Sequence, residues 1–89
     1  MKVKKEKFRP GDHTHLGNLS KGQKCKVIHL STEDKALRRR LLDMGITEGV
    51  HIKIKKIAPL GDPIDLELRG YQLCLRKRDM ATIDVEVIQ

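Results

Sequence analysis

The hydrophobic pattern changes its period at Gly45, and this change limits the fold more than any other feature of the sequence. Before Gly45, apolar residues recur every three or four positions, which predicts a helix over residues 33–44 with one buried stripe. The stripe consists of Leu37, Leu41 and Met44, with Leu42 beside it. After Gly45, apolar and polar residues alternate, which predicts a strand with one buried face. Gly45 itself stands where a left-handed residue commonly ends a helix.

The expected helix has capping and acidic residues at its start. Ser31 or Thr32 can cap it, and Glu33 and Asp34 suit the positive end of the helix dipole. Because the helix is expected to pack across the strands, Leu37→Asp would bury an unpaired charge. We therefore expect this substitution to be among the most destabilising in the chain.

Five short segments alternate like strands, and turns rich in glycine and proline separate them. They span residues 23–30, 50–57, 64–69, 71–75 and 83–87. Lys56 breaks the alternation in the second segment, which indicates a bulge or a strong bend. A flat sheet would leave exposed edges, so the pattern favours a mainly β fold, a small SH3-like barrel of about five strands. The helix is expected between the first and second strands and across the barrel, with a short helical turn at 76–81.

Length and composition suggest one small domain with a basic extension. The chain has 89 residues, and residues 1–15 carry five basic residues against two acidic ones without helical or strand periodicity. We expect a flexible N-terminal extension over residues 1–15 and a folded domain over residues 16–89. The sequence has no apolar run long enough to span a bilayer and no disulfide framework, which favours a cytoplasmic protein.

Several motifs follow one another with regular gaps. They are Leu-Ser-x-Gly at 19–22, Arg-Leu-x-x-Met-Gly-Ile-x-x-Gly at 40–49, Pro-x-Gly-x-Pro at 59–63, Gly-x-x-x-x-Leu-Arg at 70–76 and Ala-x-Ile-x-Val at 81–85. In this order they resemble the FeoA family, the small cytoplasmic proteins of bacterial ferrous iron transport. The resemblance extends from about Leu19 to Val87. It implies an SH3-like domain that assists FeoB, a membrane permease with a cytoplasmic G-protein domain.

The function implied by this resemblance is that of an accessory or regulatory protein of ferrous iron uptake. Its partner would be the cytoplasmic part of the FeoB-type permease. Its location would be the cytoplasm, with recruitment to the inner face of the cell membrane. The residues themselves contain no constellation of nucleophile and base, so we do not expect an enzyme.

The proline-rich connection at 59–63 is the most specific candidate for partner binding. Pro59 and Pro63 stiffen it and present Leu60 outward, so docking would cost little conformational entropy. The candidate partner-binding residues are Arg40, Leu60, Gly61, Asp62 and Pro63.

Simpler interpretations of these residues remain open. The connection can be an ordinary hairpin loop in which Asp62 caps its own turn, and Arg40 can pair with Asp43 or Asp62. An exposed Leu60 beside free strand edges is also compatible with self-association into a homo-oligomer.

Transition-metal binding is an alternative function, because the family lies in an iron pathway. No bound cofactor is required by the sequence, and ferrous iron or another transition metal would be the ligand. The weak metal candidates are Cys25, His29 and His51, with His13, His15 and Cys74 as further side chains. Strand parity places Cys25 and His29 on the inner face with Val27, whereas Cys74 points outward. His13 and His15 on a flexible tail would make a weak site.

Nucleic-acid binding is a second alternative, because the net charge is +7. Basic patches at 38–40, 53–56 and 76–78 could contact phosphates. Aromatic platforms for bases are lacking, since Tyr71 is the one aromatic residue after the extension and its parity with Leu73 places it inward. The sequence therefore favours a protein partner over a nucleic acid.

Overall fold

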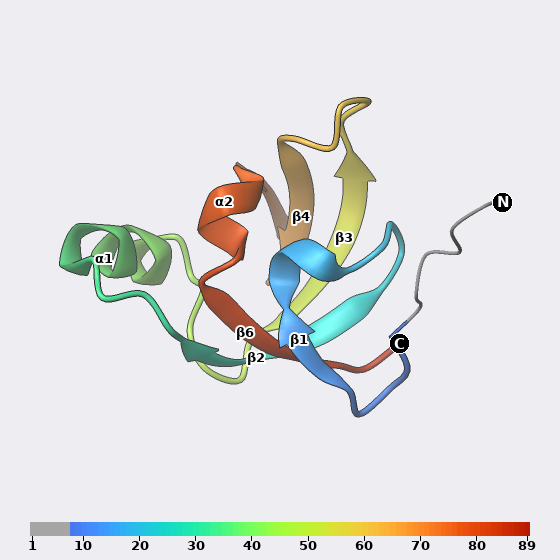
Figure 1. The fold of residues 1–89 in the computed structure, drawn as a ribbon, viewed down its shortest axis with the longest axis horizontal. Coiled ribbons are helices and arrows are strands. Elements are labelled where there is room, and N and C mark those ends of the chain that lie inside the picture. The colour runs from blue at the N-terminus through green and yellow to red at the C-terminus, as the bar shows by residue number, and fades with distance from the viewer. Residues whose placement is uncertain (1–7) are drawn as a thin grey trace, which may run out of the picture.

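The computed structural model describes residues 8–89 as six strands and three short helical segments (Figure 1). In chain order they are β1 (His13–His15), the 3-10 helix η1 (Leu16–Asn18), β2 (Lys24–Leu30), α1 (Lys35–Asp43), β3 (His51–Ile57), β4 (Ile64–Leu68), β5 (Tyr71–Leu75), α2 (Lys77–Met80) and β6 (Ile83–Val87). The expected mainly β fold is confirmed. None of the helices in residues 8–89 has the length and apolar content to cross a membrane.

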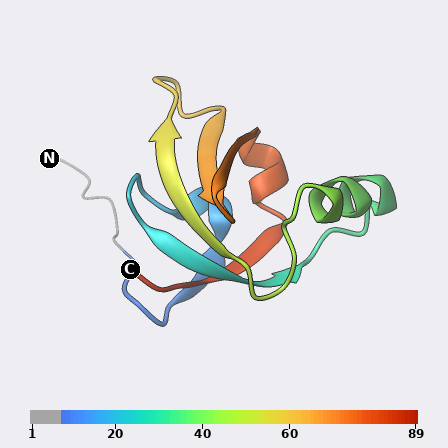
Figure 2. The same cartoon turned by 180° about the vertical axis from the view of Figure 1, so that it is seen from behind.

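The strands form one antiparallel sheet in the order β1-β6-β2-β3-β4-β5. The sheet is strongly curved, as the two opposite views in Figures 1 and 2 show. All five expected strands are present, and α1 lies in the chain between the first two of them, β2 and β3. The pairing between β3 and β4 shifts between Ile54 and Lys56, which confirms the irregularity expected near Lys56.

The sixth strand, β1, corrects the expectation of a flexible extension through residue 15. His13–His15 pairs with β6, with Thr14 opposite Val85. Before the strand, the Gly11 amide donates to the Val87 carbonyl at 2.7 Å. Three residues are too few to show an alternation, and their partner strand lies at the other end of the chain, so local patterning could not reveal them. Residues 1–7, the remainder of the expected extension, lie outside the described residues.

The core consists of apolar side chains on the inner face of the sheet, together with buried residues of η1 and α2, which pack against each other. The strands contribute Cys25, Val27, Leu30, Ile52, Ile54, Ile64, Leu66, Leu68, Leu75, Ile83, Val85 and Val87. Two further groups complete the core. The region of η1 and α2 contributes Leu16, Leu19 and Met80, and α1 with the segment after it contributes Leu41, Ile46 and Val50. Cys25 faces inward as expected, because the alternation holds in the first half of β2.

Helix α1 begins later than expected and has a different cap. Asp34 is the N-cap residue, and its Oδ1 accepts hydrogen bonds from the amides of Ala36 at 2.9 Å and Leu37 at 3.1 Å. Thr32 serves this turn indirectly, since its Oγ1 accepts from the Asp34 amide at 3.0 Å. The N-cap is therefore Asp34 and not the expected Ser31 or Thr32, because the Asp34 carboxylate lies within hydrogen-bonding distance of two backbone amides.

Helix α1 projects to one side of the sheet and does not lie across a barrel, which corrects the expected placement (Figures 1 and 2). Within α1, Leu41 is the fully buried residue, whereas Leu37 is half-buried and Leu42 is 41% exposed. The leading role expected for Leu37 in anchoring the helix therefore belongs to Leu41.

Gly45 ends α1 in the left-handed conformation that the sequence predicts, with φ of +93°. Its missing side chain also makes room for Tyr71, whose hydroxyl donates a hydrogen bond to the Met44 carbonyl. Tyr71 is 42% exposed at the start of β5, so the inward position expected from parity is wrong. Its ring lies over the helix end, and β5 is anchored in the core by Leu75.

Candidate partner-binding site

The connection between β3 and β4 is a tight, ordered turn with an exposed leucine. The Gly61 amide donates to the Ala58 carbonyl at 2.7 Å, and the Ala58 amide donates to the Pro63 carbonyl at 3.1 Å. Gly61 has φ of +90°, a conformation that favours glycine. Leu60 stands at the tip with 96% of its surface exposed. The outward position of this leucine agrees with the sequence.

Asp62 connects this loop to α2. Its Oδ1 accepts a hydrogen bond from the backbone amide of Lys77, the first residue of α2, at 2.8 Å. The residue before the helix, Arg76, makes no side-chain capping bond, so Asp62 supplies the acceptor that this end lacks. Asp62 therefore caps a helix elsewhere in the chain and not its own turn, which was the simpler interpretation of the sequence.

Arg40 contacts the same short helix from the side of α1. Its Nη2 lies 3.4 Å from Oδ2 of Asp79. The side chain of Asp79 is 17% exposed and that of Arg40 is 59% exposed, so the pair lies partly at the surface. Neither of the two partners expected for Arg40 is used, because Asp43 lies with Arg39 at 3.6 Å and Asp62 caps α2.

Helix α2 therefore joins the candidate residues that lie far apart in the sequence. In both views it lies between α1 and the loop that precedes β4 (Figures 1 and 2). Exposed cations on and before α2, namely Arg76, Lys77 and Arg78, give this region a basic surface. We call the surface formed by residues 58–63, α2 and Arg40 the loop face.

Two shallow cavities flank the loop. One, of about 370 Å³, is lined by Asp62, Pro63, Cys74, Leu75 and Arg76. The other, of about 270 Å³, is lined by Lys56, Ala58, Pro59, Pro63 and Asp65. The two cavities share Pro63, and residues on both sides of Leu60 in the chain line them. Such an arrangement can insert an apolar anchor into a partner while accepting partner side chains next to it.

The metal candidates are not brought together. Cys25 is fully buried, and burial raises its pKa to about 12 against a weaker opposing hydrogen bond from the Ile52 backbone. Metals bind the thiolate, which this environment disfavours. His51 is exposed, opposite Lys26. Within residues 8–89, no three His, Cys, Asp or Glu side chains converge in a way that could hold a metal ion.

His29 does not share the inner face with Cys25 and Val27, which corrects the expected parity. The pairing of β2 with β6 shifts between Val27 and His29, and the extra residue is Ile28. As a result Ile28 and His29 are both exposed, and burial resumes at Leu30. A sequence of alternating residues gives no signal for a bulge of this kind.

The remaining histidines and cysteine are at the surface. His15 Nδ1 lies 3.4 Å from Asp84 Oδ1, and His13 Nε2 lies 4.0 Å from Glu86 Oε1, both across the β1–β6 pair. Cys74 is exposed, as expected. Local desolvation, followed by the neighbouring carboxylates of Asp65 and Asp62, raises the pKa of its thiol.

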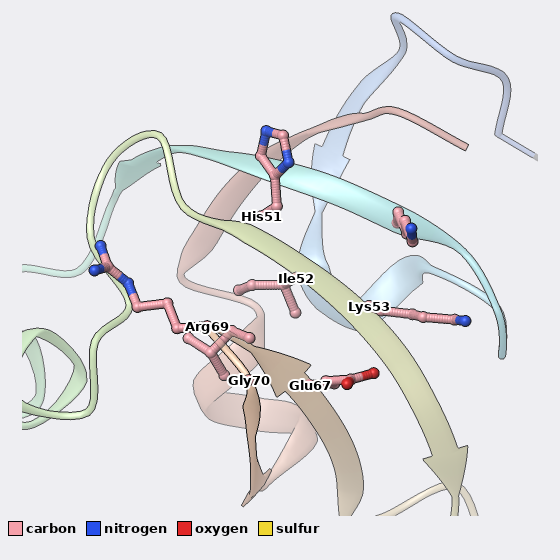
Figure 3. Close-up of a pocket in the computed structure, with 8 residues that line it drawn as sticks. His51, Ile52, Lys53, Glu67, Arg69 and Gly70 are labelled. Carbon is pink, nitrogen blue, oxygen red and sulfur yellow. The ribbon is translucent and has the colours of Figure 1, made fainter.

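The outer face of the sheet carries a basic pocket that the sequence pattern did not predict (Figure 3). Its volume is about 290 Å³, and it is lined by Lys24, His51, Ile52, Lys53, Glu67, Leu68, Arg69 and Gly70. These residues come from β2, β3 and the β4–β5 hairpin, and the strand register that joins them is not visible in the sequence.

A model of the FeoA domain matches residues 14–87, beginning within β1. The chain belongs to the FeoA family. This is a family of non-catalytic accessory proteins of ferrous iron transport, in agreement with the expectation that the chain is not an enzyme.

Relatives agree with this assignment. The solution structure of a FeoA-like protein from Clostridium acetobutylicum is 40% identical, with a TM-score of 0.80 over 92% of each chain. A FeoA/FeoB fusion protein of Porphyromonas gingivalis is 33% identical over 82% of this chain, which spans 8% of the length of that relative. The crystal structure of Stenotrophomonas maltophilia FeoA complexed with zinc, described as a prokaryotic SH3 domain protein, is 20% identical, with a TM-score of 0.72 over 82% of this chain and 89% of that one. The fold is therefore SH3-like.

Proposed function

We propose that this FeoA domain is an accessory and regulatory protein of bacterial ferrous iron uptake that binds the cytoplasmic part of a FeoB-type permease through its loop face. The exposed Leu60 on an ordered loop carries the proposal, since 96% of its surface is free to be buried. The P. gingivalis relative supports the choice of partner, because it joins the two proteins in one chain.

The loop is suited to docking because it is already held in place. The Asp62 carboxylate ties it to the amide of Lys77 at 2.8 Å, and the Gly61 amide closes its turn. An ordered loop loses little conformational entropy when it binds. Burying a leucine side chain contributes about 1.5–3 kcal/mol, which is enough to make Leu60 a main anchor.

The exposed cations of the loop face indicate an acidic partner surface. Arg40 and the exposed residues Arg76 and Arg78 lie on or beside α2. Charges at the rim of an interface mainly accelerate association and select the partner. We therefore assign Arg40, Leu60, Gly61, Asp62 and Pro63 to the interface. The protein would act in the cytoplasm, held at the inner face of the membrane by the permease.

A pull-down with the purified cytoplasmic G-protein domain of the FeoB-type permease from the same organism tests the proposal. The wild-type chain should be retained, and Leu60→Glu should reduce retention strongly. Ile28→Glu is a matched control, because Ile28 is an exposed apolar residue on the bulge of β2, far in the sequence from the loop. Repeating the assay with GTP and with ferrous iron shows which state of the permease is recognised.

Equal retention of Leu60→Glu and wild type would show that the loop is not the interface. Loss of retention in both glutamate variants would point to nonspecific charge repulsion. Leu60 is also the candidate for self-association, so sedimentation of both variants without the permease separates homo-oligomer formation from permease binding.

The two alternative functions make different predictions in the same assays. Nucleic-acid binding would fall steeply with salt and survive the loss of Leu60. Transition-metal binding would be stoichiometric, sensitive to chelators and weakened by a double substitution of Cys25 and His29. Cys25 lies in the core and His29 at the surface, so the structure gives no reason to expect that they share a metal ion. A metal site that is lost in this double variant would therefore contradict the structure.

A further inference from the structure

Two lysines face each other across the centre of the sheet, on its outer face. Lys24 of β2 lies directly opposite Lys53 of β3, and the next pair on this face is Lys26 opposite His51. Like charges directly opposite one another in an antiparallel pair are destabilising. Among residues 8–89, no ion pair involves Lys24 or Lys53, and Glu67, the direct neighbour of Lys53 on β4, forms its ion pair with Lys55 at 3.6 Å. Within the part of the chain that the structure describes, the Lys24–Lys53 pair therefore has no carboxylate in an ion pair with it.

These lysines line the basic pocket of about 290 Å³. Lys24, Lys53 and Arg69 bring three basic side chains to it against the single carboxylate of Glu67. Figure 3 shows the side chains of Lys53 and Arg69 extending away from each other, to opposite ends of the pocket, with Ile52 between them. Lys24 and Lys53, which are direct neighbours across β2 and β3, are therefore the cations that a single small ligand can contact together, and Arg69 lies at the other end of the pocket.

Arg69 occupies an unusual backbone position. It has φ of +51°, and with Gly70 at +82° it forms the two-residue turn of the β4–β5 hairpin. Such turns strongly prefer asparagine, aspartate or glycine at this first position. The Arg69 guanidinium is also held in place, since its Nη2 donates to Oγ1 of Thr47 at 3.2 Å. Backbone positions of this kind in residues other than glycine occur often at functional sites.

We propose that this pocket binds a phosphate group. A phosphate carries up to two negative charges on tetrahedrally arranged oxygens, so it can accept hydrogen bonds from several directions, whereas a carboxylate is planar and carries one charge. Lysine supplies a compact charge and arginine a planar fork, and both are common phosphate ligands. The phosphate can belong to a free small molecule or to a lipid headgroup.

This site is separate from the loop face. The pocket and the loop face share no residue. Phosphate binding would thus be an additional activity, and the variants that test it leave Leu60, Asp62 and Arg40 unchanged.

Nuclear magnetic resonance titration of the full chain provides the test. Inorganic phosphate is compared with chloride at equal ionic strength, using backbone amides and the His51 ring as reporters. Phosphate should give saturable shifts around the pocket. Removing one charged hydrogen-bond donor typically weakens binding about tenfold or more, so Lys24→Gln/Lys53→Gln should show at least that loss. The matched control is Lys35→Gln/Lys56→Gln, which removes the same charge from exposed lysines outside the pocket.

Vesicles distinguish the two sources of phosphate. Sedimentation with phosphatidylglycerol vesicles, compared with neutral phosphatidylcholine vesicles, measures headgroup binding by the same variants. A free-phosphate ligand is supported if the wild type binds inorganic phosphate saturably and Lys24→Gln/Lys53→Gln does not. A lipid headgroup is supported if the wild type binds only phosphatidylglycerol vesicles and the same variant loses that binding.

Absence of both kinds of binding would overturn the proposal, as would equal weakening in the pocket and control variants. Misfolding is a minor concern, because Lys24→Gln/Lys53→Gln removes a like-charge contact at the surface. Its melting temperature should equal or exceed that of the wild type. A lower melting temperature would show that the lysines are structural and would count against a binding role.

Discussion

The Asp62 carboxylate accepts a hydrogen bond from the backbone amide of Lys77 at 2.8 Å, across 15 positions of the chain. The contact fixes the loop that carries Leu60 to the first residue of α2. It also satisfies an amide at the start of a four-residue helix that has no side-chain cap of its own. The order of the loop and the order of α2 therefore depend on the same carboxylate.

Asp62→Ala should reduce the free energy of unfolding by about 1 kcal/mol, the usual effect of removing an N-cap acceptor. Asp62→Asn keeps an acceptor oxygen and should lose less. Urea unfolding measures both values. Hydrogen exchange at the Lys77 amide should accelerate in Asp62→Ala, because this amide loses its acceptor.

Asp43→Ala is the control for the loss of an aspartate. Asp43 makes an exposed pair with Arg39 at 3.6 Å, with side chains 68% and 80% exposed, and such pairs contribute little. If Asp62→Ala is no more destabilising than Asp43→Ala, the contact with α2 does not hold the loop in solution.

Gly45→Ala should be strongly destabilising for two separate reasons. The residue has φ of +93°, and a side chain there costs about 1 kcal/mol or more. A Cβ at this position would also collide with the Tyr71 hydroxyl. Gly22→Ala is the matched control, since Gly22 has φ of +91° with no atom within 4 Å of the added Cβ.

The difference between the two glycine variants, measured by chemical denaturation, therefore isolates the collision with Tyr71. Adding Tyr71→Phe to Gly45→Ala should recover part of that difference, because the phenylalanine ring lacks the hydroxyl. Equal losses in Gly45→Ala and Gly22→Ala would mean that Tyr71 moves away without cost.

The elements that sequence patterning predicted are those whose signals are local. Period-two alternation located five strands, and Gly45 ended the helix as expected, because each signal depends on a few consecutive residues. The irregularity at Lys56 was also visible, since two lysines in succession interrupt the alternation.

The features that patterning missed depend on distant pairing. β1 has three residues and is stabilised by β6 at the other end of the chain. The bulge at Ile28 turns His29 to the outer face of the sheet, although apolar and polar residues alternate regularly in the sequence around it. The opposition of Lys24 and Lys53 exists only through the register of β2 on β3. The basic pocket could therefore not be predicted, whereas the exposure of Leu60 could.

The leucines of α1 provide a graded test of how the helix is anchored. Leu41 is fully buried, Leu37 is half-buried and Leu42 is 41% exposed. Leu41→Ala should cost about 2–5 kcal/mol, as expected for a buried leucine. Leu37→Ala should cost less, and Leu42→Ala should be close to neutral. Urea unfolding of the three variants checks the order.

A larger loss for Leu37→Ala than for Leu41→Ala would show that α1 packs across the sheet in solution, as the sequence alone suggested. The expected order instead supports the sideways projection of the helix. In that case Leu37→Asp would place its charge at a half-exposed position and would be tolerated better than a charge at Leu41.

The last prediction concerns pH and the two cysteines. Burial raises the pKa of Cys25 to about 12 from the ordinary value of 9.0, so the folded state keeps a proton that the unfolded state loses. The stabilising contribution of the neutral thiol is present below pH 9 and is lost as the pH rises toward 12. The free energy of unfolding should therefore fall in this window by up to about 1.4 kcal/mol per pH unit from this group.

Cys25→Ala should show a shallower fall over the same window, and Cys74→Ala should change the slope less, because Cys74 is exposed and solvent screens the interactions that raise the pKa of its thiol. Parallel denaturation curves at several pH values measure the slopes. Alkylation at pH 8 should modify Cys74 in the folded protein and reach Cys25 after unfolding. Identical slopes for wild type and Cys25→Ala, together with rapid alkylation of Cys25, would place this thiol in contact with water, and the inner face of β2 would then be less tightly packed than the structure shows.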